Sequence, residues 1–573
     1  MVPYQRLFKT YWKSSNAPQK RRLVLSYFLY FVVNLLGATF PILYGIYIES
    51  IQRSPLEIVE NTWLYGVVYV LINILQWAFH GPGRLMERKL AFDVSQNFLS
   101  EKYDQLLELP LNWHESNHSG NLSNRLRKSY TALKRFIDNG FIYVQTLLQL
   151  IFSIVAMLYF VPLLGLLAMT LGFVNVWITL KFDKILTRGL SEYNEKEHRL
   201  SAGIADTFTS IATVIILRLE GLLKLDINKR IDEMYPAFRK VSKVGEIKWF
   251  TGNTLISLIY VSLIVGYVYR NYLPGETFYV GGLIALIGYV SKFTNSFNSI
   301  AYLYSGLLEM DSDIVSAQVI QNDYSRLRVP PIAGLKTWRK WDELVLENIM
   351  FEYPSNKDNI QEDHKFYFKE IKVSRGKPVA IIGKSGSGKS TLFKILSGLE
   401  GMNPSAHIKL DGLHLSDPKE IGHNSTLITQ NMEIFENTIE FNLTFGGKFT
   451  QDEVTNALNV AEIKDVIEAL PNGMNTLIRE NGANLSGGQI QRLAIARAVL
   501  FAQDSQLLLF DEITSNLDKG LADRVIGNLL RIFPKKAILA SIHNLSLLKH
   551  FDYMYQLEMG EIVYEGKPRE ILY

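Results

Sequence analysis

A glycine-rich segment with lysine and several hydroxyls, GKSGSGKST, begins at residue 383. It fits the pattern G-x-x-x-x-G-K-[ST], in which glycines let backbone N–H groups turn inward around phosphates. A helix that follows directly would add the positive end of its dipole to the same anion site. In this pattern Lys389 is expected to reach the β- and γ-phosphates of ATP, and the Ser390 hydroxyl to bind Mg²⁺. The predicted phosphate-binding residues are Gly383, Lys384, Ser385, Gly386, Ser387, Gly388, Lys389, Ser390 and Thr391.

Two adjacent carboxylates follow an apolar run farther along the chain, in LLLFDE at 507–512. The four apolar residues predict a strand buried in a parallel sheet. Asp511 is expected to hold Mg²⁺ by way of water, and Glu512 to polarise the water that attacks the γ-phosphate. A carboxylate pair is a weak signal by itself, but downstream of a phosphate-binding loop it predicts ATP hydrolysis.

The phosphate-binding loop and the two carboxylates are far apart in the sequence, so a fold must bring them together. After about residue 330, short β-rich runs alternate with helical patterns, which predicts an α/β domain. The β-rich runs are ELVLENIMFEY, KPVAIIG, STLITQ, SQLLLFDE and KKAILASI. The phosphate-binding loop then joins the strand PVAIIG to the helix STLFKILSGL. We place this domain at 341–573, after a proline-containing linker at 326–340.

The further motifs of this domain, in their order, resemble those of the nucleotide-binding domain of ABC transporters. Nearly the whole chain resembles an ABC exporter half-transporter. LSGGQIQRLAIARA matches the ABC signature, LITQNMEIFENTI the Q-loop, ASIHNL the switch-histidine segment and SNLD the D-loop. FEYP matches the position of the aromatic residue that stacks on adenine. IREN loosely matches the exporter cross-talk segment, with Glu480 in its acidic position.

The resemblance implies roles for further residues. Gln430 would link Mg²⁺ and the attacking water to the membrane domain, and His543 would contact the γ-phosphate. Tyr353 would stack on adenine, with Phe351 as the competing aromatic. Asn516 departs from the pattern, since a small alanine usually stands there. The implied sets are catalytic Glu512, His543 and Gln430; metal-binding Ser390, Gln430 and Asp511; and nucleotide-binding Tyr353, Ser486, Gly487, Gly488, Gln489 and Asp518.

The signature LSGGQ contains no acid, base or nucleophile. Gly487 and Gly488 would allow close approach of a ligand, and a helix beginning near Gln489 would offer its N–H groups to an anion. In the family, the signature of one chain faces the phosphate-binding loop of another, with ATP between them. One chain carries one of each, so we expect it to be half of a dimer. Because the catalytic residues and the signature are intact, we favour a homodimer; a heterodimer with a defective partner stays open.

The first 325 residues contain six long apolar stretches. Each is near the ~20 residues that cross ~30 Å of hydrocarbon as a helix. They predict an α-helical membrane domain of six spans at 1–325, with a short turn near Pro162 between the third and fourth. The stretches are LVLSYFLYFVVNLLGATFPILYGIYI, WLYGVVYVLINILQWAF, FIYVQTLLQLIFSIVAMLYF, LLGLLAMTLGFVNVWITL, FTGNTLISLIYVSLIVGYVY and FYVGGLIALIGYV.

Lysine and arginine are concentrated before the first span and in the two long loops that follow spans two and four. By the positive-inside rule, the N-terminus, both loops and the ATPase domain are cytoplasmic. We expect an integral multi-pass protein of the bacterial inner (plasma) membrane. Each long loop contains a turning point, LPLNWHESNHSGNL or AGIADTFTSIATV, for which we predict a role in docking to an ATPase domain.

Composition narrows the function classes. The net charge of the 573 residues is +4, too small to indicate a nucleic-acid partner. The absence of cysteine excludes disulfides, thiolate zinc sites and a cysteine-protease domain. No short apolar segment directly follows Met1, so we expect no cleavable signal peptide. No peptidase precedes the first span, which disfavours a peptide-processing exporter.

Together these features predict ATP-driven export, or flipping between leaflets, of an amphipathic substrate by alternating access. An ATP-gated channel on the same scaffold is the alternative. We rank membrane lipid or a lipid-like amphiphile ahead of drug-like compounds, peptides and glycans. Ionisable residues within spans usually face a cavity, so we predict a basic, aromatic-rich cavity for an anionic amphiphile or a polar glycan. Its expected residues are the stripe Lys292, Asn295, Ser299 and Tyr302, with His80, Arg84 and Lys248.

Overall fold

The chain folds as two compact units in the computed structural model. The first contains Met1–Leu109 and Asn117–Arg328, and the second contains Pro110–Ser116 and Val329–Tyr573. Tyr353, Glu480 and most of the expected linker lie outside the described residues. The structure describes residues 3–117, 119–275, 277–278, 280–328, 341–352, 365–399, 407–415, 419–430, 433–479 and 484–568.

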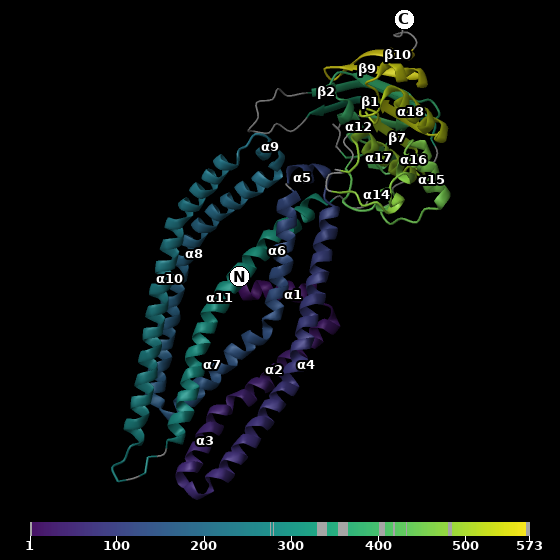
Figure 1. The fold of residues 1–573 in the computed structure, drawn as a ribbon. Helices are drawn as coiled ribbons and strands as arrows, with labels where there is room; N and C mark the ends of the chain where they lie inside the picture. The colour runs from purple at the N-terminus through teal and green to yellow at the C-terminus, as the bar shows by residue number, and fades with distance from the viewer. Residues whose placement is uncertain are drawn as a thin grey trace. The chain divides into compact units, whose positions relative to one another are not determined.

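The first unit is built of helices, and α8 and α10 run side by side along it (Figure 1). In chain order its helices are α1 (Pro3–Ser14), α2 (Ala17–Ala38), α3 (Phe40–Arg53), the 3₁₀ helix η1 (Pro55–Glu57), α4 (Ile58–Leu107), α6 (Ser119–Asp138), α7 (Gly140–Phe160), α8 (Pro162–Thr209), α9 (Ile211–Ile216), α10 (Glu220–Asn271) and α11 (Gly281–Leu327).

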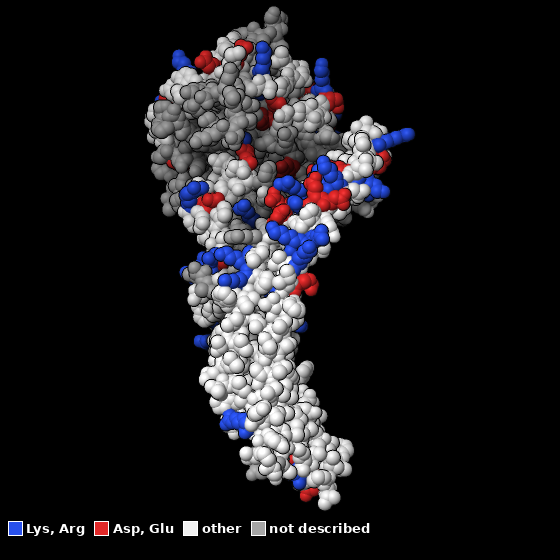
Figure 2. Space-filling model, turned by 90° about the vertical axis from the view of Figure 1, so that its left-hand side faces the viewer, with Lys and Arg blue, Asp and Glu red and all other residues white. Residues whose placement is uncertain are grey.

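Five helical segments among the described residues are long and apolar enough to cross a membrane. They contain the first five predicted spans. Residues 281–290 of the sixth predicted span form the start of α11, and α11 is not among the five. Figure 2 shows a long part of one face of this unit almost without charged side chains. The five segments are Ala17–Arg53, Pro55–Leu107, Gly140–Phe160, Pro162–Leu186 and Glu220–Asn271.

Prolines set two of the helix boundaries. Pro41 has no N–H to donate to the carbonyl of Gly37, and the first predicted span is accordingly broken at Thr39 into α2 and α3. Only Val161 separates α7 from α8, which begins at Pro162, as the predicted short turn requires. Helices α4, α8 and α10 continue well beyond their apolar stretches, as expected for the long loops.

Two apolar clusters form the core of the first unit. One joins α1, α4, α6 and α11, and it includes Leu7, Tyr11, Leu90, Leu133 and Ile314. The other joins α7, α8, α10 and α11, and it includes Met157, Ala168, Leu263, Leu286 and Phe293.

The second unit has a mixed α/β fold with two sheets. The four-stranded sheet has the order β2-β1-β4-β5 and is antiparallel, and the six-stranded sheet has the order β10-β9-β3-β8-β7-β6. From β9 to β6 the larger sheet is parallel, and β10 is its antiparallel edge. The strands are β1 (Glu343–Glu352), β2 (Lys365–Ser374), β3 (Val379–Gly383), β4 (His407–Leu410), β5 (Leu413–His414), β6 (Ser425–Ile428), β7 (Leu507–Asp511), β8 (Ala537–Ser541), β9 (Tyr553–Glu558) and β10 (Glu561–Gly566).

Apolar clusters cover both faces of the parallel strands, which explains why β7 and β8 are buried throughout. The helices of this unit are α5 (Leu111–Ser116), α12 (Lys389–Leu396), α13 (Lys419–Gly422), α14 (Ile439–Thr444), α15 (Gln451–Val460), α16 (Lys464–Glu468), η2 (Gly473–Asn475), α17 (Gly487–Phe501), α18 (Lys519–Ile532) and η4 (Leu545–His550).

The two predicted turning points form the short helices α5 and α9. Helix α5 belongs to the second unit, where Glu115 Oε1 lies 3.1 Å from Lys394 Nζ. Helix α9 belongs to the helical unit and exposes large apolar side chains, with Ile215 60% and Ile216 77% exposed. The docking role of α9 therefore stays a prediction.

Candidate functional site

Three predicted segments end neighbouring strands of the parallel sheet. The phosphate-binding loop follows β3, His543 follows β8 and Glu512 follows β7, and β8 lies between the other two. Ser541 pairs with Ile381 on one side and with Asp511 on the other. The carboxyl ends of these strands therefore meet at one edge, where open α/β sheets bind ligands.

The glycines of the phosphate-binding loop are required by geometry at two positions. Gly388 has φ +98°, and a Cβ there would lie 2.6 Å from the Phe366 ring. A Cβ at Gly383 would lie 2.5 Å from the carbonyl oxygen of Leu557. The loop therefore packs tightly on its inner side. Its crest, formed by Lys384, Ser385 and Gly386, is exposed.

Lys389 is the first residue of α12, and its side chain is only 5% exposed. Its Nζ donates to the carbonyl oxygens of Gly383 and Lys384 at 2.8 and 3.1 Å. The ammonium thus lies inside the curve of the loop, where a phosphate group is expected. Ser387 Oγ is also buried, with no hydrogen-bond partner among the described residues.

The acidic end of β7 is held by a serine that the sequence analysis missed. Ser541 Oγ donates to Asp511 Oδ1 at 2.8 Å and accepts the Glu512 N–H at 2.9 Å. Glu512 has φ +51°, a left-handed conformation that is uncommon outside glycine. Such a backbone needs surrounding support, and the Ser541 hydroxyl supplies part of it. The only signal in the sequence was a hydroxyl at the end of an apolar strand.

The Glu512 carboxylate contacts the two other groups expected around the γ-phosphate. Its Oε1 lies 2.8 Å from His543 Nε2 and 3.6 Å from Lys389 Nζ. The Glu512 side chain is 12% exposed, whereas that of His543 is 57% exposed. A carboxylate, an ammonium and an imidazole therefore converge beside the phosphate-binding loop, an arrangement that could contact a terminal phosphate.

Gln430 comes two residues after β6, the strand next to β7, and its side chain is exposed. Its neighbour Ile428 pairs with Phe510, which places Gln430 at the same edge as Asp511. The sites predicted at Tyr353 and Glu480 lie outside the described residues. Phe351, the competing aromatic, lies in β1 and packs against the core of the ATPase unit.

The signature forms the beginning of α17, which starts at Gly487 rather than near Gln489. Ser486 and Gln489 make a capping box: the Gln489 N–H donates to Ser486 Oγ at 3.3 Å, and the Ser486 N–H donates to Gln489 Oε1 at 2.8 Å. Both predicted nucleotide contacts thus also fix the helix start. The start of a helix offers further N–H groups that can bind an anion.

The two signature glycines differ in their surroundings. A Cβ at Gly487 would meet no described atom within 4 Å. A Cβ at Gly488 would lie 3.0 Å from the carbonyl oxygen of Asn516 in the D-loop. Gly488 is therefore constrained within its own chain, whereas Gly487 faces open space.

The D-loop is tied to α17 by a buried amide. Gln491, 3% exposed, accepts the Asn516 N–H at 3.0 Å and donates to Ser515 Oγ at 3.3 Å. Asp518 caps α18 by accepting the Leu521 N–H at 2.9 Å. Gln491 lies two positions after the signature and was not predicted.

Arg492 supports the same helix from its other side. Its Nε donates to the Gly488 carbonyl at 3.3 Å, and its guanidinium also donates to the Glu462 carbonyl. Burial lowers the pKa of Arg492, and the nearby carboxylates of Glu462 and Asp518 partly offset this. An arginine stays charged under such a shift, so this end of α17 keeps a positive charge.

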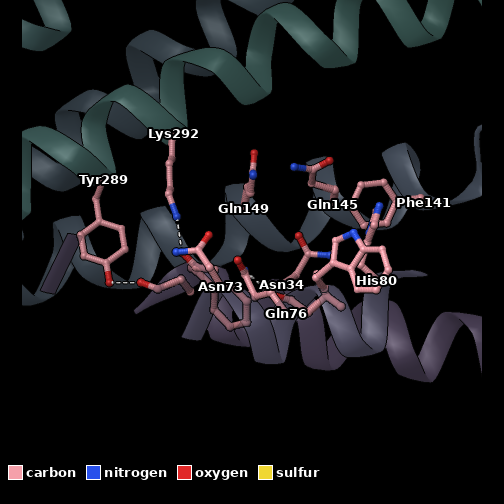
Figure 3. Close-up of a pocket in the computed structure, with 14 residues that line it drawn as sticks. Asn34, Asn73, Gln76, His80, Phe141, Gln145, Gln149, Tyr289 and Lys292 are labelled. Carbon is pink, nitrogen blue, oxygen red and sulfur yellow. Dashed lines mark hydrogen bonds between the residues drawn. The ribbon is translucent and has the colours of Figure 1, made fainter. Parts of the chain in front are cut away.

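Four of the seven residues expected in one basic cavity are divided between two cavities. Lys292 and His80 line a cavity of about 300 Å³ between α2, α4, α7 and α11 (Figure 3). Lys248 and Tyr302 line another, of about 340 Å³, between α8, α10 and α11. Neither lining includes the other three predicted residues, Arg84, Asn295 and Ser299.

Two of the basic side chains have carboxylate partners inside the helical unit. Lys248 Nζ lies 2.5 Å from Asp183 Oδ1, and Arg84 pairs with the fully buried Glu87. Their charge is neutralised locally. Within one copy of the chain, the predicted residues therefore do not line a single cavity.

Several carboxamides also line the first cavity, and they were not predicted from the sequence. Those of α4 and α7 recur at helical spacing within apolar stretches, at positions 73 and 76 and at positions 145 and 149. That spacing is a signal that sequence alone contains. The side chains concerned are Asn34, Asn73, Gln76, Gln145 and Gln149 (Figure 3).

Comparison with protein families agrees with this architecture. A model described as ABC transporter matches residues 369–515, and one described as ABC transporter transmembrane region matches residues 23–297. The chain belongs to the ABC transporters, as an exporter half-transporter with a transmembrane domain followed by a nucleotide-binding domain. It is thus an integral multi-pass membrane protein and an ATP-binding ATPase coupled to export. A half-transporter implies a dimer partner.

Its relatives carry different cargoes by name. The chain is 25% identical to the mesentericin-Y105 transport/processing protein MesD of Leuconostoc mesenteroides, over 96% of this chain and 74% of that protein. It is 23% identical to the beta-(1→2)glucan export protein NdvA of Brucella suis, over 99% and 92%. It is 35% identical to the lipid A-core flippase of Albidiferax ferrireducens, over 41% and 40%.

A solved structure of a bacterial Atm1-family ABC exporter with ATP bound has the same fold. The TM-score is 0.78 at 20% identity, with 97% of each chain covered. The fold is therefore that of the exporters.

Proposed function

We propose that two identical copies of this chain form an exporter that uses ATP hydrolysis to move an amphipathic substrate across the membrane, or between its leaflets, by alternating access. The observation that carries the proposal is the Glu512 carboxylate, which is held beside both Lys389 and His543 at the phosphate-binding loop. The proposed domain boundaries are 1–325 for the membrane domain, 326–340 for the linker and 341–573 for the ATPase domain.

In the proposed reaction, the N–H groups of the phosphate-binding loop and Lys389 hold the β- and γ-phosphates. Glu512 polarises the attacking water, and His543 contacts the γ-phosphate. A negative γ-phosphate would compete with Glu512 for the Lys389 ammonium. The carboxylate would then be released from its cation and become a better proton acceptor.

The residues near the loop suit Mg²⁺. Ser390 offers an exposed hydroxyl at the start of α12, and Asp511 offers a carboxylate that Ser541 orients. Such hard oxygen donors, completed by phosphate and water, are what Mg²⁺ prefers. When bound, Mg²⁺ would neutralise charge on the phosphates. Gln430, exposed at the same edge, would be a third ligand.

Two features support a partner chain. The start of α17 presents Gly487 to open space with no acid or base of its own, so it suits the phosphates of a second chain's ATP. Helix α9 exposes Ile215 and Ile216, which suit an apolar docking surface on the partner's ATPase unit. With Glu512, His543 and the signature all present, two equivalent sites can form.

The orientation in the membrane rests on charge. Lys and Arg gather in the N-terminal segment and in the two long loops, so we place these parts and the ATPase unit in the cytoplasm. The bacterial inner membrane is the proposed location.

The decisive experiment measures ATP turnover of the purified protein in lipid nanodiscs. Glu512→Gln should abolish turnover while ATP stays bound, because the amide cannot accept the proton of the attacking water. Glu468→Gln, an exposed glutamate of α16, is the matched control and should hydrolyse ATP normally. Normal turnover by Glu512→Gln would exclude Glu512 as the base.

A further inference from the structure

The cavity between α2, α4, α7 and α11 is lined by amides and aromatic rings rather than by paired charges. Among the described residues that line it, none is an aspartate or a glutamate. We propose that this cavity binds an uncharged, polyhydroxylated head group, such as a sugar ring, on the exported amphiphile. The inference rests on the proposed export function and assigns a substrate class to it.

Lys292, a lysine that lines this cavity, bonds to the backbone near the break between α2 and α3. Pro41 has no N–H, so the Gly37 carbonyl lacks its helical donor. Lys292 Nζ donates to this carbonyl at 2.5 Å, and Tyr289 Oη donates to the next one, that of Ala38, at 2.6 Å. Figure 3 shows both side chains extending from α11 toward this break. The charge of Lys292 is therefore engaged by backbone and is not set out for an anion.

Three of the carboxamides have a defined orientation. Asn34 Nδ2 and Asn73 Nδ2 each donate to the carbonyl four residues earlier in their own helix, at 2.8 and 2.9 Å. Gln76 Nε2 donates to the Val33 carbonyl at 3.0 Å. Because a carbonyl only accepts hydrogen bonds, these contacts fix which end of each amide is nitrogen. Each side chain then presents its oxygen as an acceptor.

Helix association explains only part of this pattern. Polar side chains commonly join membrane helices by hydrogen bonds, and Gln76 joins α4 to α2 in this way. Asn34 and Asn73 bond within their own helices and join nothing. Asn34 is also 7% exposed. Asn73, by contrast, is exposed at the cavity. An amide oxygen in a membrane is stabilised when a donor reaches it, which favours a ligand that brings donors.

Lys292, the amide oxygens and the aromatic rings of the cavity together favour one class of head group. A cationic head group would meet the Lys292 ammonium in the same cavity. An anionic head group would set its acceptor oxygens against those of the amides. Hydroxyl groups both donate and accept, and the C–H face of a sugar ring can pack on the aromatic rings of Trp77, Phe141 and Phe152. An uncharged polyol is therefore the class that the lining favours.

The test compares head groups on one lipid anchor. The full-length dimer is placed in phosphatidylcholine nanodiscs that also contain monoglucosyl-diacylglycerol, phosphatidylglycerol or diacylglycerol with the same acyl chains. The glucosyl lipid should raise ATP turnover several-fold over phosphatidylcholine alone, and the other two should not. It should also change tryptophan fluorescence, and Trp77→Phe should remove that change.

Substitutions at two asparagines test whether the glucosyl lipid stimulates turnover by binding in this cavity. Asn34→Leu and Asn73→Leu keep the side-chain size but remove the acceptor, so the ratio of stimulated to basal turnover should fall to about one. Asn271→Leu is the matched control, because Asn271 Nδ2 makes the same bond within its helix, to Tyr267 at 2.8 Å, outside this cavity. Its stimulation ratio should equal that of the wild type.

Three results would overturn the inference: equal or greater stimulation by phosphatidylglycerol, no fluorescence or turnover response to the glucosyl lipid, or an unchanged ratio in both asparagine variants. Basal ATP turnover distinguishes failure of the head-group assignment from failure of the proposed ATPase function. If wild-type protein hydrolyses ATP and Glu512→Gln does not, the proposed ATPase mechanism stands and only the head-group assignment fails.

Discussion

Glu512 and His543 are in contact across the ends of two neighbouring strands, with Oε1 and Nε2 2.8 Å apart. The same carboxylate oxygen lies 3.6 Å from Lys389 Nζ. The proposed base is therefore positioned by the two groups that would contact the γ-phosphate. The backbone of Glu512 has an unusual φ of +51°, and the Ser541 hydroxyl supports it by accepting the Glu512 N–H.

Loss of that hydroxyl should slow hydrolysis without removing any group that touches ATP. Ser541→Ala leaves the buried Asp511 carboxylate and the Glu512 N–H without their partner, at a cost of roughly 1–3 kcal/mol. If that cost falls on the transition state, kcat drops by about tenfold or more. Steady-state ATP turnover measures this. Ser541→Thr keeps the hydroxyl and should retain most activity, so equal rates for the two variants would show that the hydroxyl is not needed.

Turnover should require a divalent cation that is held partly by Asp511. Chelation with EDTA should abolish hydrolysis, and added Mg²⁺ should restore it. Asp511→Asn should raise the Mg²⁺ concentration for half-maximal turnover by about tenfold, since a neutral amide binds a hard cation less strongly. Asp523→Asn, which removes an aspartate that pairs with Lys549 and His550, is the control and should leave the Mg²⁺ curve in place. Hydrolysis in EDTA would contradict the prediction.

The ATPase motifs could be predicted because each combines a local pattern with a strand end. The run LLLF became the buried strand β7, and the loop after β3 opens α12 as expected. Ser541 could not be predicted in its role, since that role depends on the register that sets it opposite Asp511. A helix was expected to begin near Gln489, and α17 begins at Gly487, where the spacing of Ser486 and Gln489 is that of a capping box.

The membrane cavity was harder to predict because helix periodicity does not say which faces meet. Spacing alone grouped Lys292 with Tyr302, yet they line different cavities. The partner of Lys248 is 65 residues away in the chain, at Asp183. The Arg84–Glu87 pair, in contrast, is three residues apart and could have been predicted from local spacing.

Helix α9 should couple nucleotide binding to the membrane helices. Ile215→Asp combined with Ile216→Asp places two charges on its exposed apolar surface, so docking on a partner should fail. We expect ATP turnover to persist while ATP and vanadate no longer alter the proteolysis pattern of the helical unit. Leu225→Asp, an exposed leucine of α10, is the control and should keep the wild-type response. A wild-type response in the α9 variant would exclude this docking role.

Gly487 is a sharper probe of a neighbouring nucleotide than Gly488. A side chain at Gly488 would press on Asn516 in its own chain, whereas one at Gly487 meets no described atom within 4 Å. Gly487→Asp should therefore preserve the thermal midpoint and the binding of a fluorescent ATP analogue to the chain's own loop. Turnover should fall by at least about tenfold, because the carboxylate repels the phosphates that the helix start would receive. Gly487→Asp with normal turnover would mean that this surface meets no ATP.

Complementation between chains should reveal the composite site. A Lys389→Ala chain has an intact signature, and a Gly487→Asp chain has an intact phosphate-binding loop, so each homodimer should be inactive. A dimer with one copy of each contains one site with both halves intact, and the mixture should regain part of the wild-type turnover. The control carries both substitutions on one chain and is mixed with a Glu512→Gln chain. It should stay inactive, because the only intact loop and signature then belong to a single chain that lacks the base. If the first mixture also stays inactive while mixed dimers form, the two halves of the site do not come from different copies of this chain.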